Sequence, residues 1–287
     1  GDFFADWPGH AVLTAQLTAR LEGEEDYERQ LDAARRWAKD WHFRIGVHHL
    51  RGRVDGATAG QHYTDLADAV LAALWPVVVD QFSRRHGPPP GRGAVIVGMG
   101  SLGAGQLSAQ SDLDMIVIYD PQDVEMSDGR RPLASRQYYA RLTQAMITAI
   151  TAPMAEGRLY EVDMRLRPSG NQGPVATSLK SFRDYQLNEA WVWEHLALTR
   201  ARVVTGNGAL AADIETFRSE LIGQPRETAA VLSEVRDMRR RVAQAKHSAG
   251  ILDAKTGRGR MMDIELLAQA GALLAGQVSR DVPAGLA

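Results

Sequence analysis

Cysteine is absent from the 287-residue sequence, which excludes disulfide bonds and thiolate metal sites. Net charge is also nearly absent, at −2, so no overall field draws the chain to nucleic acid or to a membrane surface. No uninterrupted apolar run reaches the roughly eighteen residues that a membrane span requires, and no signal-peptide pattern is present. We therefore expect neither nucleic acid nor membrane as a partner. The first residue is Gly1 rather than Met, which favours a piece of a longer protein.

The most informative stretch of the chain runs from Val95 to Asp120. Two short runs rich in Val and Ile, separated by a glycine-rich turn, predict two buried strands. Asp112 and Asp114 open the second strand, and because strand side chains alternate, both are expected on one face while Leu113 enters the core. Two carboxylates on one face repel each other unless a cation lies between them. This arrangement is typical of a Mg²⁺ ion that carries a nucleoside triphosphate.

Two other interpretations fit parts of this stretch. Gly98-x-Gly100-x-x-Gly103 after a strand is also the dinucleotide-binding pattern, and Asp120 stands about twenty residues further on. Only residues 104–111 remain for a crossover helix, whereas a parallel crossover needs about a dozen residues or more. In the plain structural alternative, Asp112 caps a turn and Asp114 is solvated.

A glycine and serine followed about ten residues later by Asp-x-Asp resemble the signature of the DNA polymerase β-like nucleotidyltransferase superfamily. The resemblance implies that Gly100 and Ser101, at a helix N-terminus, hold the β- and γ-phosphates. It also implies a third carboxylate on a later strand.

Asp163 can supply that third carboxylate. It lies in an alternating stretch, residues 159–168, in which Arg165 and Arg167 share its predicted face and Pro168 ends the strand. Either arginine can neutralise phosphate charge, or it can form a structural ion pair with the carboxylates.

Most of the remaining chain shows helical spacing of apolar residues, with predicted helices over 24–50, from Thr64 onward, and over 135–150, 188–202, 228–247 and 266–274. His195 is expected on a helix surface, and Asp263 is expected to cap the last helix. We predict an α+β fold with a polymerase β-like nucleotidyltransferase core, a small mixed sheet with helices. The expected division is an N-terminal helical segment (1–87), the catalytic core (88–222) and a C-terminal helical segment (223–287) that begins a further helical domain.

Four motifs in order extend the resemblance from the superfamily to one family, glutamine synthetase adenylyltransferase. They are Ser-Asp-Leu-Asp (111–114), Val-Asp-Met-Arg-Leu-Arg-Pro-Ser-Gly (162–170), Trp-Glu-His (193–195) with Arg-Ala-Arg (200–202), and Asp-Ile-Glu (263–265). That family is a large cytoplasmic bacterial enzyme with two homologous nucleotidyltransferase halves. One half attaches AMP to a tyrosine of glutamine synthetase, and the other removes it by phosphorolysis.

Two residues indicate which half this chain is similar to. Ser169 in Arg-Pro-Ser-Gly and His195 in Trp-Glu-His are typical of the C-terminal, adenylylating half, whereas the removing half tends to carry Asp and Arg at these positions. Many family members have Lys where this chain has Ser101, so a lysine-specific phosphate contact is not expected here.

The resemblance implies Mg²⁺-dependent transfer of AMP from ATP to a tyrosine hydroxyl of glutamine synthetase, with release of pyrophosphate. Asp112, Asp114 and Asp163 would hold the metal, and Asp163 would also help to take the tyrosine proton. It further implies a cytoplasmic location and regulation by the PII signalling protein and glutamine through the full-length enzyme. Removal of AMP by phosphorolysis and a catalytically inactive nucleotide-binding module remain alternatives. No role is assigned to Glu265.

Overall fold

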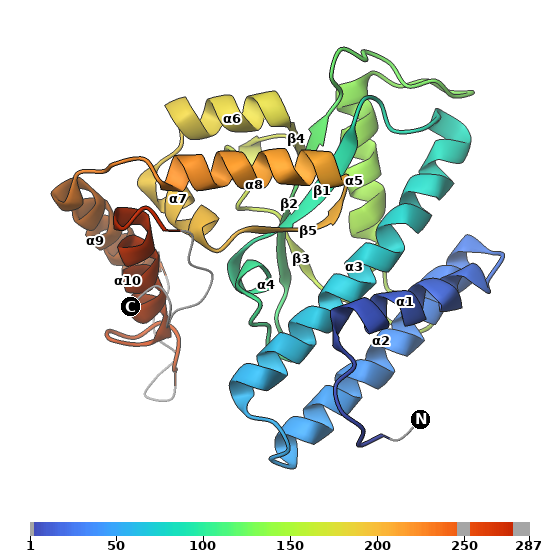
Figure 1. Cartoon of the computed structure of the whole chain (residues 1–287), viewed down its shortest axis with the longest axis horizontal. Helices are drawn as coiled ribbons and strands as arrows, with labels where there is room; N and C mark the ends of the chain where they lie inside the picture. The colour runs from blue at the N-terminus through green and yellow to red at the C-terminus, as the bar shows by residue number, and fades with distance from the viewer. Residues whose placement is uncertain (1–2, 246–252, 278–287) are drawn as a thin grey trace.

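The computed structural model describes residues 3–245 and 253–277 and shows an α+β fold (Figure 1). In chain order the helices are α1 (Gly9–Glu22), α2 (Tyr27–Leu50), α3 (Gly56–His86), α4 (Gly100–Ala104), α5 (Ser135–Thr151), α6 (Leu179–Asn188), α7 (Val192–Thr199), α8 (Gly208–Ile222), α9 (Thr228–Ala245) and α10 (Met261–Leu274). The strands are β1 (Gly93–Gly98), β2 (Leu113–Asp120), β3 (Val162–Asp163), β4 (Ala176–Ser178) and β5 (Arg202–Gly206), and a short 3₁₀ helix, η1, covers Gly170–Gln172.

The sheet is mixed and small, with the order β3-β2-β1-β5, and β4 pairs with β2 beyond β3. β1 lies antiparallel to β2, with Gly98 opposite Met115, whereas β3 and β4 both run parallel to β2. An antiparallel β1–β2 pair is incompatible with the dinucleotide-binding unit, which needs parallel neighbouring strands. The predicted fold class is confirmed.

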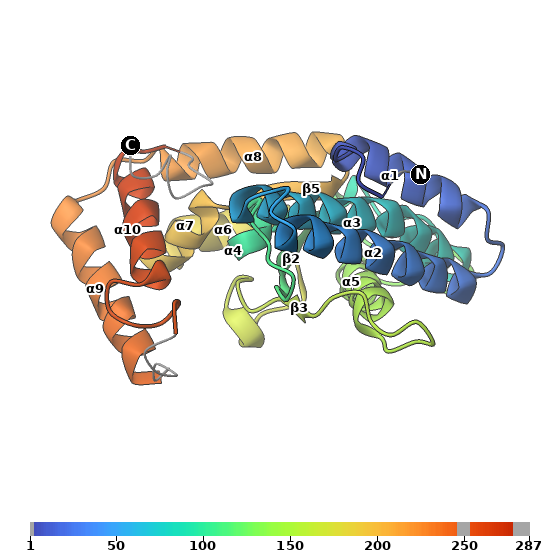
Figure 2. The same ribbon diagram turned by 90° about the horizontal axis from the view of Figure 1, so that it is seen from below.

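Helices cover both faces of the sheet, and Figure 2 shows α8 and α5 on opposite sides of it. On one face Val97 and Ile118 pack with apolar residues of α6 and α8, and on the other face Ile96 and Val117 belong to the cluster that includes α1, α2, α3 and α5. Both faces of β2 are therefore buried, which explains its continuous apolar run. A third cluster joins α7 to α9 and α10. The division of the chain into three segments stays a prediction.

Helix α3 begins earlier than the sequence pattern predicts. Asp55 is the N-cap and accepts a hydrogen bond from Thr58 N at 2.8 Å, so the predicted start of this helix at Thr64 was wrong. Thr64 is buried inside α3, where its hydroxyl accepts from Leu107 N at 3.1 Å. The helix thereby holds the loop that leads to Asp112.

By length and composition, α3 is the one helix among residues 3–245 and 253–277 that passes the test for a membrane span. The core helix of a globular protein can be equally long and apolar, and 56% of the most apolar 18-residue stretch of α3 is buried inside the protein.

The helix predicted over 188–202 is present but shorter, as α7 over Val192–Thr199, because the chain leaves helical geometry after α6. Trp191 has extended backbone, and Glu194 accepts from Trp191 N at 3.0 Å to start α7. Residues 202–206 then form β5, which pairs antiparallel with β1. Tertiary pairing with β1 decides the conformation of this short segment, and the local pattern did not reveal it.

A buried arginine joins α2 to the segment that precedes β3. The guanidinium of Arg35 is fully buried and donates to four carbonyl oxygens, those of Leu31, Ala149, Ala152 and Gly157, at 2.7–3.0 Å. Four of its five N–H donors are used, so removal of this side chain takes a hydrogen bond from each of four carbonyl groups.

We therefore expect Arg35→Met to lower the free energy of unfolding by about 3 kcal/mol, measured by urea denaturation. Arg36→Met is the matched control, because Arg36 pairs at 3.2 Å with Glu156 and its side chain is 46% exposed; it should cost less than about 1 kcal/mol. Equal effects of the two substitutions would contradict the structural role given to Arg35.

Candidate active site

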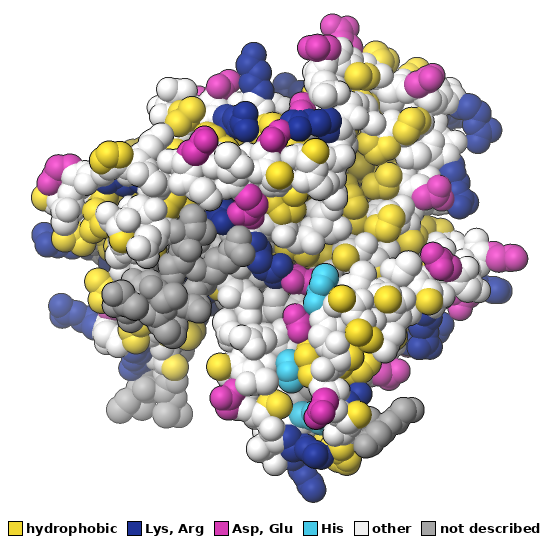
Figure 3. Space-filling model, in the orientation of Figure 1, with side chains coloured by type: hydrophobic (Ala, Val, Ile, Leu, Met, Phe, Trp, Pro, Cys, Tyr) yellow, Lys and Arg dark blue, Asp and Glu magenta, His cyan; other side chains and the backbone are white. Residues whose placement is uncertain are grey.

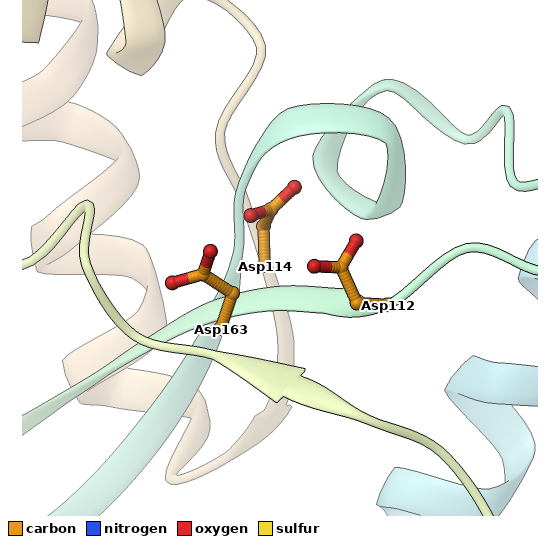
Figure 4. Close-up of side chains that lie close together, drawn as sticks. All are labelled: Asp112, Asp114 and Asp163. Carbon is orange, nitrogen blue, oxygen red and sulfur yellow. The ribbon is translucent and has the colours of Figure 1, made fainter.

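Three carboxylates converge where β2 begins. Asp112 directly precedes the strand and Asp114 is its second residue, while the side chain of Leu113 between them is fully buried. The parallel pairing of β3 with β2 sets Asp163 opposite Asp114. One carboxylate oxygen from each of the three side chains lies within 4.8 Å of the others (Figure 4). The structure thus brings together the three predicted acidic residues, which are 51 positions apart in sequence from first to last.

The electrostatics of this cluster favour a cation. Burial, together with repulsion from Asp112 and Asp163, raises the pKa of Asp114 to about 6. The pKa of Asp163 is instead lowered, chiefly by its hydrogen bonds with Arg165. A set of carboxylate oxygens with no nitrogen or sulfur suits a hard divalent cation such as Mg²⁺. The residues present therefore fit the predicted metal.

The strand that carries Asp163 is shorter than predicted. β3 ends at Asp163 because Arg165 turns back: its backbone N–H donates to Asp163 Oδ1 at 2.8 Å and its guanidinium pairs with Oδ2 at 2.5 Å. Arg167 donates to the carbonyl oxygens of Met164 at 2.7 Å and Gly173 at 3.3 Å. The two arginines thus do not share a strand face. Arg165 neutralises one carboxylate, and Arg167 holds the loop that follows.

The glycine turn rests directly against Asp114. Met99 N donates to the carbonyl oxygen of Asp114 at 2.8 Å, and α4 starts at the next residue, with Ser101 half-buried. Gly100 has φ +52°, and a Cβ there would lie 2.3 Å from Asp114 Oδ2. Gly103 is needed for packing, since its Cβ would lie 2.3 Å from the carbonyl oxygen of Arg200. The glycines therefore let backbone N–H groups approach the acidic cluster closely.

Sequence reasoning missed Lys255, which lies in the connection between α9 and α10. Its ammonium lowers the pKa of Asp114 against the effect of burial. Asp253 fixes this connection by accepting from Lys255 N at 2.9 Å and Thr256 N at 3.1 Å. The sequence feature that could have indicated this residue is a lysine two positions before a Gly-x-Gly pattern. Figure 3 shows Lys or Arg, Asp or Glu, and His side chains lying side by side near the middle of this face of the molecule.

The two acidic residues that follow Lys255 hold the last helix in place. The prediction that Asp263 caps α10 was wrong, because Arg260 is the N-cap and Asp263 is the third residue of the helix. Asp263 instead accepts from Gly259 N at 2.7 Å and pairs with Arg239 of α9, so it joins the two C-terminal helices. Glu265 pairs with Arg200 at 3.1 Å, which connects α10 to the residue whose carbonyl oxygen packs against Gly103.

Ser169 and His195, which the resemblance links to the adenylylating half, lie in another part of the core. Ser169 has φ +59° and is a hydrogen-bond partner of Tyr185. The hydroxyl of Tyr185 also donates to the buried carboxylate of Glu194 at 2.9 Å. His195 does not lie free on a helix surface as predicted. It is half-buried, its Nε2 bonds with the carbonyl oxygen of Gln186 at 3.0 Å, and burial lowers its pKa.

A small mixed sheet with three carboxylates beside a glycine turn is the arrangement of a nucleotidyltransferase domain. The family model of glutamate-ammonia ligase adenylyltransferase matches residues 3–217. The chain belongs to this family.

Three relatives share the printed name bifunctional glutamine synthetase adenylyltransferase/adenylyl-removing enzyme. The protein of Mesorhizobium japonicum is 46% identical over 272 residues, 94% of this chain and 28% of the relative. Those of Brucella suis and Rhizobium meliloti are 44% and 43% identical, over 96% and 94% of this chain and 28% of each relative. The chain therefore spans about a quarter of the length of these relatives.

The pKa of Asp114 predicts how stability depends on pH. Because the folded state holds this proton more tightly than the unfolded chain, metal-free protein loses stability as pH rises from about 4 to about 6. In EDTA we expect Asp114→Asn to raise the free energy of unfolding by about 1–3 kcal/mol at pH 8, and by little at pH 4. Urea denaturation at both pH values measures this. Asp123→Asn, on an exposed loop, serves as the control, and an equal gain for Asp114→Asn at pH 4 and pH 8 would refute the explanation.

The contact between the glycine turn and Asp114 predicts a defect in metal binding. Gly100→Ala places a methyl group on Asp114 Oδ2 and should weaken binding of Mn²⁺, used as a probe, at least tenfold in calorimetric titrations. Gly105→Ala is the matched control, because Gly105 has φ +75° but no atom within 4 Å of its Cβ position. It carries the backbone strain of about 1 kcal/mol without the clash. Equal losses of Mn²⁺ affinity in both variants would argue against the contact.

Proposed function

We propose that this chain transfers AMP from ATP to a tyrosine hydroxyl of glutamine synthetase and releases pyrophosphate. The observation that supports the proposal is the convergence of Asp112, Asp114 and Asp163 beside the Gly100 turn. Membership of the family supports AMP as the transferred group and glutamine synthetase as its acceptor, because the names of the relatives include both.

The three carboxylates would hold Mg²⁺, which when bound neutralises the charge of the triphosphate. The chain itself positions the reactants. Backbone N–H groups at Gly100 and Ser101 would bind the β- and γ-phosphates, and Lys255 adds a positive charge that acts on Asp114. Arg165 pairs with Asp163 and can turn toward phosphate, because its side chain is 71% exposed.

Asp163 is the residue proposed to accept the tyrosine proton. A free tyrosine has a pKa of about 10, so its hydroxyl needs an acceptor near neutral pH. In the structure Arg165 occupies both oxygens of Asp163 and keeps the pKa of this carboxyl low. Movement of the Arg165 guanidinium onto phosphate would free the carboxylate for this role.

Phosphorolytic removal of AMP is the second candidate function, because the relatives are named for an adenylyl-removing activity as well. In that reaction phosphate would attack the AMP–tyrosine linkage, and ADP and the free tyrosine hydroxyl would be released; the same carboxylates would hold the metal. Ser169 and His195 favour attachment over removal through the resemblance described above. We further propose a cytoplasmic location, and regulation by PII protein and glutamine through the full-length enzyme.

The direct test incubates this chain with unmodified glutamine synthetase, Mg²⁺ and ATP labelled at the α-phosphorus. We expect label on glutamine synthetase and release of pyrophosphate. Asp112→Asn/Asp114→Asn should reduce transfer at least a hundredfold, because both metal ligands are lost while side-chain shape is kept.

The other results separate the alternatives. Absence of label, with ADP released from adenylylated glutamine synthetase and phosphate, would assign the removing activity. Absence of both reactions, with ATP still bound, would replace the proposal by a nucleotide-binding module that lacks catalysis.

A further inference from the structure

A cavity of about 390 Å³ opens beside Asp112 on the side of α2. A volume of this size lies within the range of about 300–1,000 Å³ typical of pockets that hold small ligand groups. Its walls come from α2 and from the two loops that lead into β2 and β3. The lining residues are Arg35, Ala38, Lys39, His42, residues 109–112 and residues 158–161.

The cavity and the glycine turn contact different members of the carboxylate cluster. Gly100 and the charge of Lys255 are next to Asp114, whereas the cavity borders Asp112, the exposed member of the three. Figure 4 shows the turn of α4 curled above Asp112 and Asp114, with pale blue helix ribbon of the N-terminal segment beyond Asp112.

In-line displacement at phosphorus requires the attacking oxygen and the leaving group to lie on opposite sides. If pyrophosphate leaves from the glycine turn, as proposed above, the acceptor hydroxyl has to enter from the other side of the carboxylates. The cavity beside Asp112 provides that entry.

The walls of the cavity are fixed before any ligand arrives. Arg35 holds residues 149–157 against α2 through three carbonyl groups. On the other wall, His42 Nε2 bonds with the carbonyl oxygen of Ala109 at 3.0 Å, and Ser111 Oγ accepts from Ser108 N at 2.9 Å. A pocket whose walls are tied in this way loses little entropy on binding.

The charges in the lining indicate what kind of group it can hold. Arg35 is occupied by carbonyl groups and Arg158 pairs with Glu161 at 2.7 Å. Lys39 forms no ion pair within residues 3–245 and 253–277, and its ammonium lies over Gly157, where a Cβ would be 3.6 Å from Nζ. The cavity thus combines space for a side chain with one available positive charge.

We propose that this cavity receives the tyrosine-bearing segment of the protein acceptor, and that Lys39 binds an acidic side chain of that segment. The inference rests on the proposed function and adds the position and the charge of the acceptor site. It makes Lys39 a residue for acceptor recognition, separate from the residues that hold ATP.

The test measures KM for glutamine synthetase and for ATP separately, in the labelled-transfer assay. Lys39→Glu should raise KM for glutamine synthetase at least tenfold and leave KM for ATP within twofold. Lys39→Arg should stay within threefold of the original chain in both. Lys180→Glu, a charge reversal at an exposed lysine of α6, should change neither constant and controls for net charge.

A second measurement uses the acceptor. If every Asp and Glu in the segment around the modified tyrosine is replaced by its amide, the original chain and Lys39→Glu should become equal in KM for glutamine synthetase. A segment without Asp or Glu would overturn the role given to Lys39.

The outcomes distinguish the two proposals. Transfer by the original chain, with an unchanged KM for glutamine synthetase in Lys39→Glu, would overturn the acceptor site alone. Equal rises of both KM values in Lys39→Glu would also overturn it, because the defect would then include ATP. Absence of transfer by the original chain would overturn the proposed function, and the acceptor site with it.

Discussion

Mutual repulsion among three carboxylates is the constraint on which the rest of the structure depends. Asp112, Asp114 and Asp163 come within 4.8 Å of one another, an arrangement that is unfavourable without positive charge. The fold tolerates it through a partner for Asp163 in Arg165, the nearby charge of Lys255, and a raised pKa at Asp114. Stability given up at such a position is common where a site is built for a charged ligand.

The helices surrounding the sheet act mainly as supports for this cluster. Thr64 of α3 holds the loop before Asp112, and Arg35 of α2 holds the segment before β3. A buried ion pair between Asp68 of α3 and Arg202 of β5, at 2.7 Å, lies next to the carbonyl oxygen of Leu102 in α4. The N-terminal helices and the sheet therefore share one core, so a substitution in these helices affects the packing of the sheet.

Much of the site was readable from local pattern, and the remainder depended on contacts distant in sequence. Val- and Ile-rich runs predicted β1 and β2, and alternation placed Leu113 in the core. Asp163 was found because its neighbours alternate, although its strand is two residues long. The strand β5 was missed because it exists only by pairing with β1. Lys255 was missed because its effect on Asp114 depends on the folded structure, and no sequence periodicity indicates it. Asp163 and Arg165 were correctly grouped, but through a turn and not through a shared strand face.

The way β3 and β4 attach to the sheet has a consequence for how the family can diversify. Both strands pair with the same edge of β2, at Leu113–Asp114 and at Val117–Tyr119. The intervening loop, which holds Arg165, Arg167 and Ser169, is therefore anchored at both ends. Insertions or substitutions within it need not alter the register that sets Asp163 against Asp114. Evolution can vary this loop while the relative positions of the three carboxylates are inherited unchanged.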